Sequence, residues 1–214
     1  MGFNLFNKYF KKVDNQQFPL KLYDSTLHKS TYFGVQIQKN PLDLFLYQEI
    51  LYKLKPDFII EIGSLYGGSA LYFSHILDLL GHGEVISIDI SHSHIYQQVK
   101  EKTNITLIES DAKLCFDKVK SIVKDKKCFV IEDSSHEYDN TLQILIIYSA
   151  LVSIGSYFIV EDTVCHHGLE AGPFPGPYEA VQEFLKLNDS FEIDFEMHKF
   201  VLTFNPNGFL KRVK

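Results

Sequence analysis

Hydrophobic and polar positions alternate between two patterns from residue 57 onward. Short runs rich in Ile, Val and Phe are followed by longer stretches in which apolar residues recur at helical spacing. Short buried strands alternating with amphipathic helices are typical of βαβ units around a parallel sheet, so we predict a doubly wound α/β fold. The predicted strands are 58–62, 85–90, 105–109, 128–133 and 157–161, and the predicted helices between them are 68–80, 92–102, 112–124 and 138–151.

The two flanks of this region have different patterns. Residues 42–54 have helical periodicity, and Asn40 followed by Pro41 is a typical helix start. In the tail, a helix is predicted from Pro177 to about residue 186, followed by an antiparallel pair formed by 191–195 and 199–205. We therefore divide the chain into an N-terminal arm or lid, 1–40, and one domain, 41–214.

Length and charge narrow the classes of function. A chain of 214 residues fits one domain with extensions. The net charge is −6, and all but one of the 21 basic residues are lysine, so only Arg212 offers a guanidinium group for phosphate or guanine. Nucleic acid is an unfavourable partner. The three cysteines, Cys115, Cys128 and Cys165, form no paired motif, which predicts a reduced, cytoplasmic protein.

The N-terminus has no apolar run typical of a signal peptide, and no segment has the roughly 20 apolar residues of a membrane span. Two interpretations of the arm stay open. Phe3, Phe6 and Phe10, with lysines between and after them, fit a short helix in peripheral contact with a membrane surface. The same residues fit an arm that packs on the domain or contacts another copy of the chain.

The first predicted strand leads into a glycine-rich loop. Ligands of open α/β sheets bind beyond the carboxyl ends of the strands, where glycines let the backbone approach them. The spacing Glu-x-Gly-x-x-x-Gly differs from the dinucleotide pattern and resembles the S-adenosylmethionine loop of class I methyltransferases. A turn that only joins strand to helix is the alternative. The candidate cofactor residues of this loop are Glu61, Gly63, Tyr66, Gly67 and Ser69.

Two aspartates close the next strands. Asp89 ends the second strand, where a carboxylate can accept hydrogen bonds from ribose hydroxyls. A solvated strand end is the alternative for it. Asp111 follows the third strand and fits either the adenine end of the same pocket or the N-cap of the helix that begins at Ala112.

A group of carboxylates follows the fourth and fifth strands. If these strands are neighbours, three acids would meet at their ends: Asp133, Glu161 and Asp162. Negative charges at such short distances are stable only when one acid is protonated or a cation is bound between them. An oxygen donor set suits Mg²⁺. A capping box from Ser134 to Glu137 is an alternative for that segment, but it leaves the three acids unexplained.

Histidines near the carboxylates supply candidates for proton transfer. His136 lies three residues after Asp133, so it is predicted to accept a proton from a hydroxyl group acidified by the metal. Whether His166 or His167 contacts substrate stays open. The Gly- and Pro-rich segment 163–176 is predicted to overhang the pocket, with Phe174 and Tyr178 as stacking faces for a sugar ring; an ordered surface loop is the alternative.

Several motifs together resemble one family. They are Gln38-Lys39-Asn40-Pro41, Tyr47-Gln48-Glu49-Ile50, Glu61-Ile62-Gly63, Tyr66-Gly67-Gly68-Ser69-Ala70, Val160-Glu161-Asp162-Thr163 and Gly176-Pro177-Tyr178-Glu179-Ala180-Val181. This combination is similar to the cephalosporin hydroxylase and rhamnosyl O-methyltransferase family. The resemblance covers the chain from about residue 33 almost to its end.

The resemblance implies a Rossmann-like class I methyltransferase fold, with a mostly parallel sheet and an antiparallel C-terminal strand pair. It also implies S-adenosylmethionine and Mg²⁺ as cofactors, and a homo-oligomer. In such relatives an Asp-x-x-His after strand four and an acidic pair after strand five are implied to hold the metal and supply the base. These map onto Asp133, His136, Glu161 and Asp162.

We therefore expect O-methylation of a sugar hydroxyl on a glycan, glycolipid or glycosylated metabolite. Hydroxylation by iron is disfavoured, because the sequence has no His-x-Asp and His136 is followed directly by Glu137. Two rivals remain: a catechol-type O-methyltransferase acting on a small molecule, and a non-catalytic module that binds a glycan or nucleotide.

Overall fold

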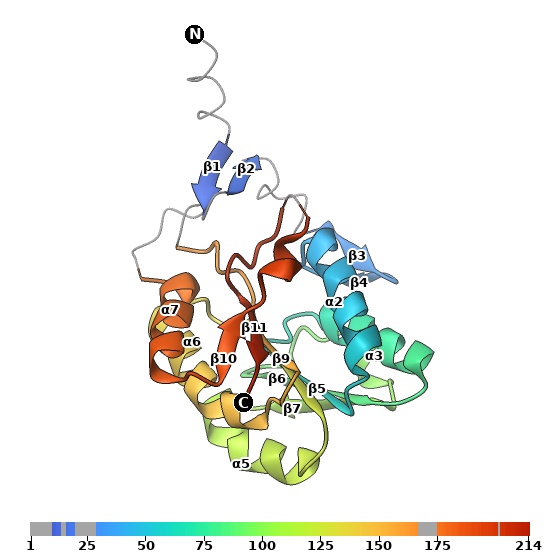
Figure 1. Ribbon diagram of the computed structural model, residues 1–214. Helices are drawn as coiled ribbons and strands as arrows, with labels where there is room; N and C mark the ends of the chain where they lie inside the picture. The colour runs from blue at the N-terminus through green and yellow to red at the C-terminus, as the bar shows by residue number, and fades with distance from the viewer. Residues whose placement is uncertain (1–9, 14–15, 20–28, 167–174, 201) are drawn as a thin grey trace.

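The computed structural model describes residues 10–13, 16–19, 29–166, 175–200 and 202–214 (Figure 1). Its strands are β1 (Phe10–Val13), β2 (Gln16–Pro19), β3 (Thr31–Tyr32), β4 (Val35–Gln36), β5 (Phe58–Ile62), β6 (Glu84–Asp89), β7 (Ile105–Glu109), β8 (Cys128–Glu132), β9 (Tyr157–Val160), β10 (Phe191–Ile193) and β11 (Phe209–Arg212). Its α-helices are α2 (Pro41–Leu54), α3 (Gly68–Leu80), α4 (Gln97–Lys100), α5 (Ala112–Val123), α6 (Tyr138–Tyr148) and α7 (Pro177–Leu187), with short 3₁₀ helices at η3 (Ser149–Leu151) and η4 (Phe195–His198).

The main sheet has seven strands in the order β10-β11-β9-β8-β5-β6-β7. The strands from β9 to β7 are parallel, whereas β11 is antiparallel to β9 and β10 is antiparallel to β11. The chain moves from β5 outward to β7 and then returns to β8 on the other side of β5. This reversal between β5 and β8 confirms the predicted doubly wound fold and opens a crevice at the carboxyl ends of the two strands.

Helices cover both faces of the sheet (Figure 1). Ile60 and Ile62 of β5 point to the face covered by α5, α6 and α7, whereas Ile59 points to the face covered by α2, α3 and α4. Because successive side chains of a strand alternate between faces, both faces of the central strands are apolar. Each fully buried Ile or Phe stabilises the fold by about 1.5–3 kcal/mol, so this double core holds the strand ends in fixed relative positions.

Polar residues define where the helices begin. Asn40 Oδ1 accepts a hydrogen bond from Leu42 N at 3.1 Å, and Pro41 occupies the first helical position of α2. The predicted start of this helix is therefore confirmed. At α7, Pro177 is again the first helical residue, and the Glu179 side chain accepts from Gly176 N at 2.8 Å.

The predicted helix 92–102 is wrong over its first half, because α4 spans only Gln97–Lys100. Tyr96 N donates to the carbonyl oxygen of Tyr66 at 3.3 Å and not to that of His92, four residues earlier, as a helix would require. Side chains hold the preceding amides in a turn. Ser91 N donates to Asp89 Oδ1 at 3.3 Å, and His92 N donates to Glu109 Oε2 at 2.7 Å. Local hydrogen bonds of this kind compete with helix formation.

The strand predicted at 199–205 is also wrong, since β10 pairs with β11, Phe209–Arg212. Phe204 N donates to Asp43 Oδ2 at 2.9 Å, and Asn205 N donates to Thr203 Oγ1 at 3.0 Å. These amides are therefore held by side chains and are not available for a sheet. A turn at residues 206 and 207 then leads the chain into β11.

Two further local predictions differ from the structure. The capping box from Ser134 to Glu137 does not form: α6 begins at Tyr138, its N-cap Glu137 makes no side-chain cap, and Ser134 Oγ instead donates to Glu132 Oε1 at 2.7 Å. The helix considered for the N-terminal arm is contradicted at Phe10–Val13, which forms β1 and pairs antiparallel with β2. Extended backbone paired in this way cannot be helical; Phe3 and Phe6 lie outside the described residues.

No helix in the described ranges is both long and apolar enough to cross a membrane. The division of the chain at residue 40 stays a prediction.

Candidate active site

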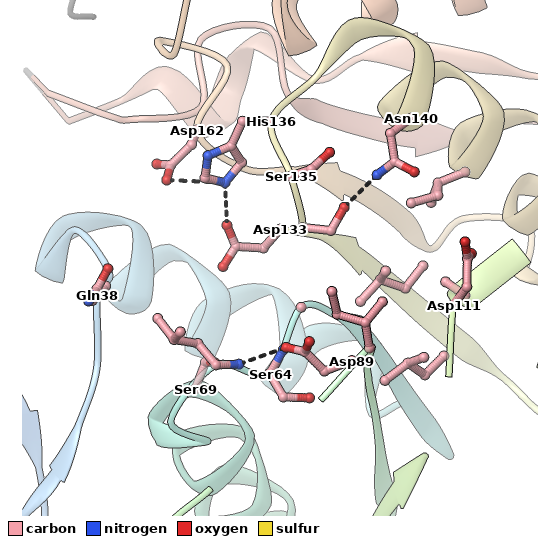
Figure 2. A pocket seen from close by; sticks show the side chains of 18 of the residues that line it. Gln38, Ser64, Ser69, Asp89, Asp111, Asp133, Ser135, His136, Asn140 and Asp162 are labelled. Carbon is pink, nitrogen blue, oxygen red and sulfur yellow. Dashed lines mark hydrogen bonds and ion pairs between the residues drawn. The ribbon is translucent and has the colours of Figure 1, made fainter. Parts of the chain in front are cut away.

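A cavity of about 670 Å³ lies at the carboxyl edge of the parallel strands. Its walls come from the segments that follow β5, β6, β7, β8 and β9, together with residues 36–39. Figure 2 shows Asp133, His136 and Asp162 gathered on one side, with Asp89 and Ser64 across the cavity from them. The cavity therefore occupies the crevice at which the strand order reverses.

The loop after β5 is held tightly between its neighbours. Gly63 has a φ of +103°, and a Cβ atom there would lie 1.9 Å from the carbonyl oxygen of Asp133. The amides of Ser64 and Leu65 donate to Asp89 Oδ2 at 2.8 and 3.0 Å. Asp89 thus fixes the loop while it also lines the cavity.

Glu61 supports this loop from inside the sheet. It is fully buried, and its Oε2 accepts a hydrogen bond from Ser87 Oγ at 2.6 Å; Ser87 Oγ lies 2.7 Å from Ser64 Oγ. Burial raises the pKa of Glu61 to about 7, although the charge of Lys39 opposes this shift. Glu61 is absent from the cavity wall among the described residues, so its geometry fits a supporting role under the loop.

The structure brings most of the predicted cofactor residues to the cavity. Gly67 is an exception: it lies behind the wall as the N-cap of α3, with a φ of +85°. Asp111 lines the cavity and also accepts from Lys113 N at 2.8 Å as the N-cap of α5, so the predicted cap is confirmed while its contact with adenine stays a prediction. Asp133 is also predicted to contact the cofactor, and the predicted cofactor residues on the wall are Gly63, Tyr66, Ser69, Asp89, Asp111 and Asp133.

His136 stands between two carboxylates. Its Nε2 lies 3.2 Å from Asp133 Oδ1 and 3.6 Å from Asp162 Oδ2, as Figure 2 shows. Burial disfavours the charged ring, but hydrogen bonds with Asp133 and Cys165 and the charge of Asp162 outweigh it and raise the pKa of His136 well above its ordinary value. His136 and Asp162 have positive φ angles of 57° and 51°. Such strain in non-glycine residues clusters at functional sites.

Sequence reasoning missed Lys39. Its buried Nζ contacts Asp133 and lies 2.7 Å from Glu161 Oε2. Burial opposes the charge of Lys39, but the carboxylates of Asp133, Glu161 and Glu61 prevail and raise its pKa above the ordinary value. The sequence did contain one indication of such a lysine: a predicted cluster of buried acids requires a positive charge nearby.

The donor atoms at this end of the cavity fit a hard cation. Asp133 and Asp162 both approach His136, whereas Glu161 reaches Asp133 through Lys39. Glu161 Oε1 is buried and has no hydrogen-bond partner among the described residues, so one carboxylate oxygen is left for a ligand. Burial and the charge of Asp133 raise the pKa of Glu161, whereas Lys39 and His136 overcome the burial of Asp133 and lower its pKa. The carboxylates, together with this orphaned oxygen, match the oxygen donors of Mg²⁺.

The remaining substrate candidates are less informative. His166 is absent from the cavity wall, and its Nδ1 is buried with no partner among the described residues. His167 and Phe174 lie outside the described residues. Tyr178 accepts a hydrogen bond from Asn207 Nδ2 at 3.1 Å and is also absent from the described cavity wall.

Comparison with known sequences gives a consistent result. A family model described as Rhamnosyl O-methyltransferase/CmcI matches residues 24–213. The rhamnosyl O-methyltransferase of Mycobacterium tuberculosis strain H37Rv is 33% identical over 195 residues, which cover 86% of this chain and 78% of the relative. The enzyme of the same name from Mycobacterium leprae is 33% identical over 194 residues, with 86% and 83% covered.

Solved structures agree on the fold. A CmcI structure with Mg and SAM superimposes with a TM-score of 0.70 at 22% identity, covering 100% of this chain and 97% of that one. CalS11, a TDP-rhamnose 3'-O-methyltransferase of calicheamicin biosynthesis, gives 0.54 at 16% identity, with 79% and 78% covered. The chain therefore has the fold of class I S-adenosylmethionine methyltransferases.

Proposed function

The chain belongs to the rhamnosyl O-methyltransferase/CmcI family and is an S-adenosylmethionine-dependent O-methyltransferase; from this premise we propose that it methylates a hydroxyl group of a sugar. The sugar would belong to a glycan, a glycolipid or a glycosylated metabolite. Relatives named rhamnosyl O-methyltransferase support this class of acceptor.

The observation that carries the proposal is the position of His136. Its Nε2 lies between Asp133 Oδ1, at 3.2 Å, and Asp162 Oδ2, at 3.6 Å, on the wall of the cavity that also reaches Asp89 and Asp111. A proton acceptor and a candidate cofactor site therefore share one enclosed space. This arrangement is what transfer of a group to a hydroxyl requires.

The cofactor end is formed by the loops after β5, β6 and β7. S-adenosylmethionine, when bound, supplies a methyl group on a positively charged sulfur. The carboxylate of Asp89 accepts hydrogen bonds from ribose hydroxyls, and Asp111 lies toward the adenine. Gly63 keeps the loop clear of side-chain atoms next to the Asp133 backbone.

The metal end is formed by Asp133, Glu161 and Asp162. Mg²⁺ held there would acidify the acceptor hydroxyl and align it for attack. Lys39 neutralises Asp133 and Glu161 in the structure described here, so these two acids keep their conformation through an ion pair.

His136 accepts the hydroxyl proton at Nε2. The carboxylates of Asp133 and Asp162 orient its ring and stabilise the protonated form. Their negative charge also raises the pKa of His136, so a cation that neutralises these carboxylates would lower that pKa and favour the neutral, proton-accepting ring. General base catalysis of this kind contributes about 10²- to 10⁴-fold in rate.

Methyl-transfer assays with defined acceptors test this proposal. Purified protein is incubated with labelled S-adenosylmethionine and either a rhamnoside or a catechol, with Mg²⁺ or with a chelator. We expect label on the rhamnoside only when Mg²⁺ is present. Preferential labelling of the catechol would replace the sugar acceptor with a small phenol.

Cofactor binding can be tested without an acceptor. Calorimetric titration of S-adenosylhomocysteine should give micromolar binding to the wild type, typical of a substrate site, and much weaker binding to Asp89→Asn. An absence of heat and of any thermal shift with the wild type would favour a non-catalytic binding module.

Assembly and location remain predictions from the sequence. We propose a homo-oligomer, and the outer face of α2 supports it, because Leu42, Phe45 and Tyr52 are 37%, 53% and 67% exposed at helical spacing. Light scattering after size exclusion gives the mass directly, and a monomer would contradict the prediction. A cytoplasmic location is proposed from the reduced cysteines and is tested by cell fractionation.

A further inference from the structure

Three side chains with different metal-binding atoms, one of them the proposed base His136, lie close together. His136 follows β8, whereas Asp162 and Cys165 follow β9. Among the described residues, each of the three offers one ligand atom, and these atoms all lie within 4.8 Å of one another. Cys165 N donates to the carbonyl oxygen of Asp162 at 2.8 Å, so a turn brings these two residues together.

The donor set differs from that expected for Mg²⁺. An imidazole nitrogen, a carboxylate oxygen and a thiolate sulfur form a mixed set that suits Zn²⁺ and similar thiophilic ions, whereas Mg²⁺ prefers oxygen alone. The proposed magnesium ligands Asp133, Glu161 and Asp162 leave the thiol of Cys165 unused. The two sets share Asp162, so the two ions would compete.

One of the three ligand separations already matches that of a tetrahedral centre. With Zn–N near 2.0 Å and Zn–S near 2.3 Å, ligand atoms of a tetrahedral zinc ion lie about 3.5 Å apart. His136 Nε2 and Asp162 Oδ2 are already 3.6 Å apart. Because the three ligand atoms lie within 4.8 Å of one another, the thiol of Cys165 has to approach by no more than about 1.3 Å to reach such a spacing.

The group is also accessible from the cavity. His136 and Asp162 both line it, with side chains 28% and 23% exposed, while Cys165 is buried next to them and absent from the described wall. An ion can therefore enter from the cavity, reach the thiol and keep a fourth position open toward the cavity. Open fourth positions are usual where zinc has three protein ligands.

We propose that His136, Asp162 and Cys165 form an inhibitory site for a thiophilic divalent ion such as Zn²⁺. The ion takes the lone pair of His136 that would otherwise accept the hydroxyl proton, and it takes Asp162 from the magnesium set. The binding itself is argued from the donor atoms and their spacing, independently of the reaction. Its inhibitory effect rests on the proposed function.

Cobalt absorption tests the site without any acceptor. Co²⁺ titrated into the full-length wild type should give a thiolate-to-cobalt charge-transfer band and visible bands of tetrahedral intensity, both removed by Zn²⁺. Cys165→Ser should lose the charge-transfer band, with an affinity for Co²⁺ lowered by about 10- to 100-fold. Cys115→Ser is the matched control, because Cys115 is also buried but contacts Ala112 and Tyr148, and it should keep the band.

Absence of the band in the wild type, or its persistence in Cys165→Ser, would overturn the proposed site. Cys165→Ala provides a second variant if the serine is poorly folded. With an accepted rhamnoside, Zn²⁺ should inhibit methyl transfer by the wild type, and Cys165→Ser should need at least about tenfold more Zn²⁺. Equal inhibition of the wild type and Cys165→Ser by Zn²⁺ would overturn the inhibitory role. If the cobalt band appears but no acceptor is methylated, the ion site stands and the proposed function is rejected.

Discussion

The ammonium group of Lys39 lies 2.7 Å from a carboxylate oxygen of Glu161, and the same group contacts Asp133. Lys39 precedes α2, whereas Glu161 follows β9. One buried cation therefore connects the segment before the first helix of the α/β domain to two strand ends of the sheet. The ion pairs place these acids where the magnesium ligands are proposed.

Lys39→Met should destabilise the metal-free protein by about 3–5 kcal/mol, because it leaves two buried carboxylates without their cation. Addition of Mg²⁺ should restore part of the loss, since a divalent cation can neutralise the same acids. Urea unfolding with and without Mg²⁺ measures both effects.

Lys102→Met is the matched control for this comparison. It removes a partly exposed ion pair with Asp78, 2.6 Å long, so it should cost no more than about 1 kcal/mol and show no response to Mg²⁺. If Mg²⁺ left the stability of Lys39→Met unchanged, the acids near Lys39 would not be the metal ligands.

His136→Ala should lower kcat by about 10²- to 10⁴-fold while binding of S-adenosylhomocysteine is retained, because the ring accepts a proton but does not hold the cofactor. Steady-state kinetics and calorimetry separate the two quantities. His82→Ala serves as a control, since His82 is exposed and contacts the backbone of Lys55. Near-normal turnover by His136→Ala, together with none by Asp133→Ala, would assign the proton to another group.

Gly63→Ala should abolish binding of S-adenosylhomocysteine and lower the melting temperature. A Cβ atom there lies 1.9 Å from Asp133 O, so either the loop or the end of β8 has to move. Gly155→Ala is the control for backbone strain alone, because Gly155 has a φ of +80° and no atom lies within 4 Å of an added Cβ. This variant should lose about 1–2 kcal/mol of stability and bind S-adenosylhomocysteine normally. Similar behaviour of the two variants in both assays would show that crowding at Gly63 is unimportant.

Because of Asp43, the free energy of unfolding should decrease as the pH rises from about 4 to about 7. Burial raises its pKa to about 7 in the folded state, although hydrogen bonds with Thr203 and Phe204 oppose this. Between the unfolded and folded pKa values the folded protein binds the extra proton, so the free energy of unfolding falls by up to about 1.4 kcal/mol per pH unit.

Asp43→Asn removes this titration while its side-chain oxygen can still accept from Phe204 N. Denaturant unfolding of both proteins between pH 4 and pH 8 measures the difference. We expect the stability of the variant relative to the wild type to increase toward pH 7. A constant difference across this range would mean that Asp43 titrates normally.

The central strands could be predicted from the sequence because the physics that forms them is local. The central strand β5 is mostly apolar because it is buried on both faces, and 58–62 was predicted with the bounds observed in the structure. The half-buried edge strand β7 was also predicted with its observed bounds, 105–109, from its run of β-branched and apolar residues. The cap at Asp111 is also a short-range feature, formed with Lys113 N. Local patterns of this kind can be read directly along the chain.

The failed predictions depend on contacts between distant residues. Residues 199–205 have the composition of a strand, but the Phe204 amide is taken by Asp43, which is far away in the chain. Lys39 likewise meets its partners only after the sheet has formed. Neither contact produces a periodic pattern or a motif along the chain, so patterns of neighbouring residues could not predict these contacts.

Because the strand order reverses, the two sides of the cavity wall come from two separate stretches of the chain. Gly63 follows β5, Asp89 ends β6 and Asp111 follows β7. On the other side, Asp133 and His136 follow β8, and Asp162 follows β9. We therefore expect insertions or exchanges after β9 to alter which acceptor is chosen without rebuilding the half proposed to hold the methyl donor. A chimera joined within α5 would inherit donor recognition from one parent and acceptor choice from the other.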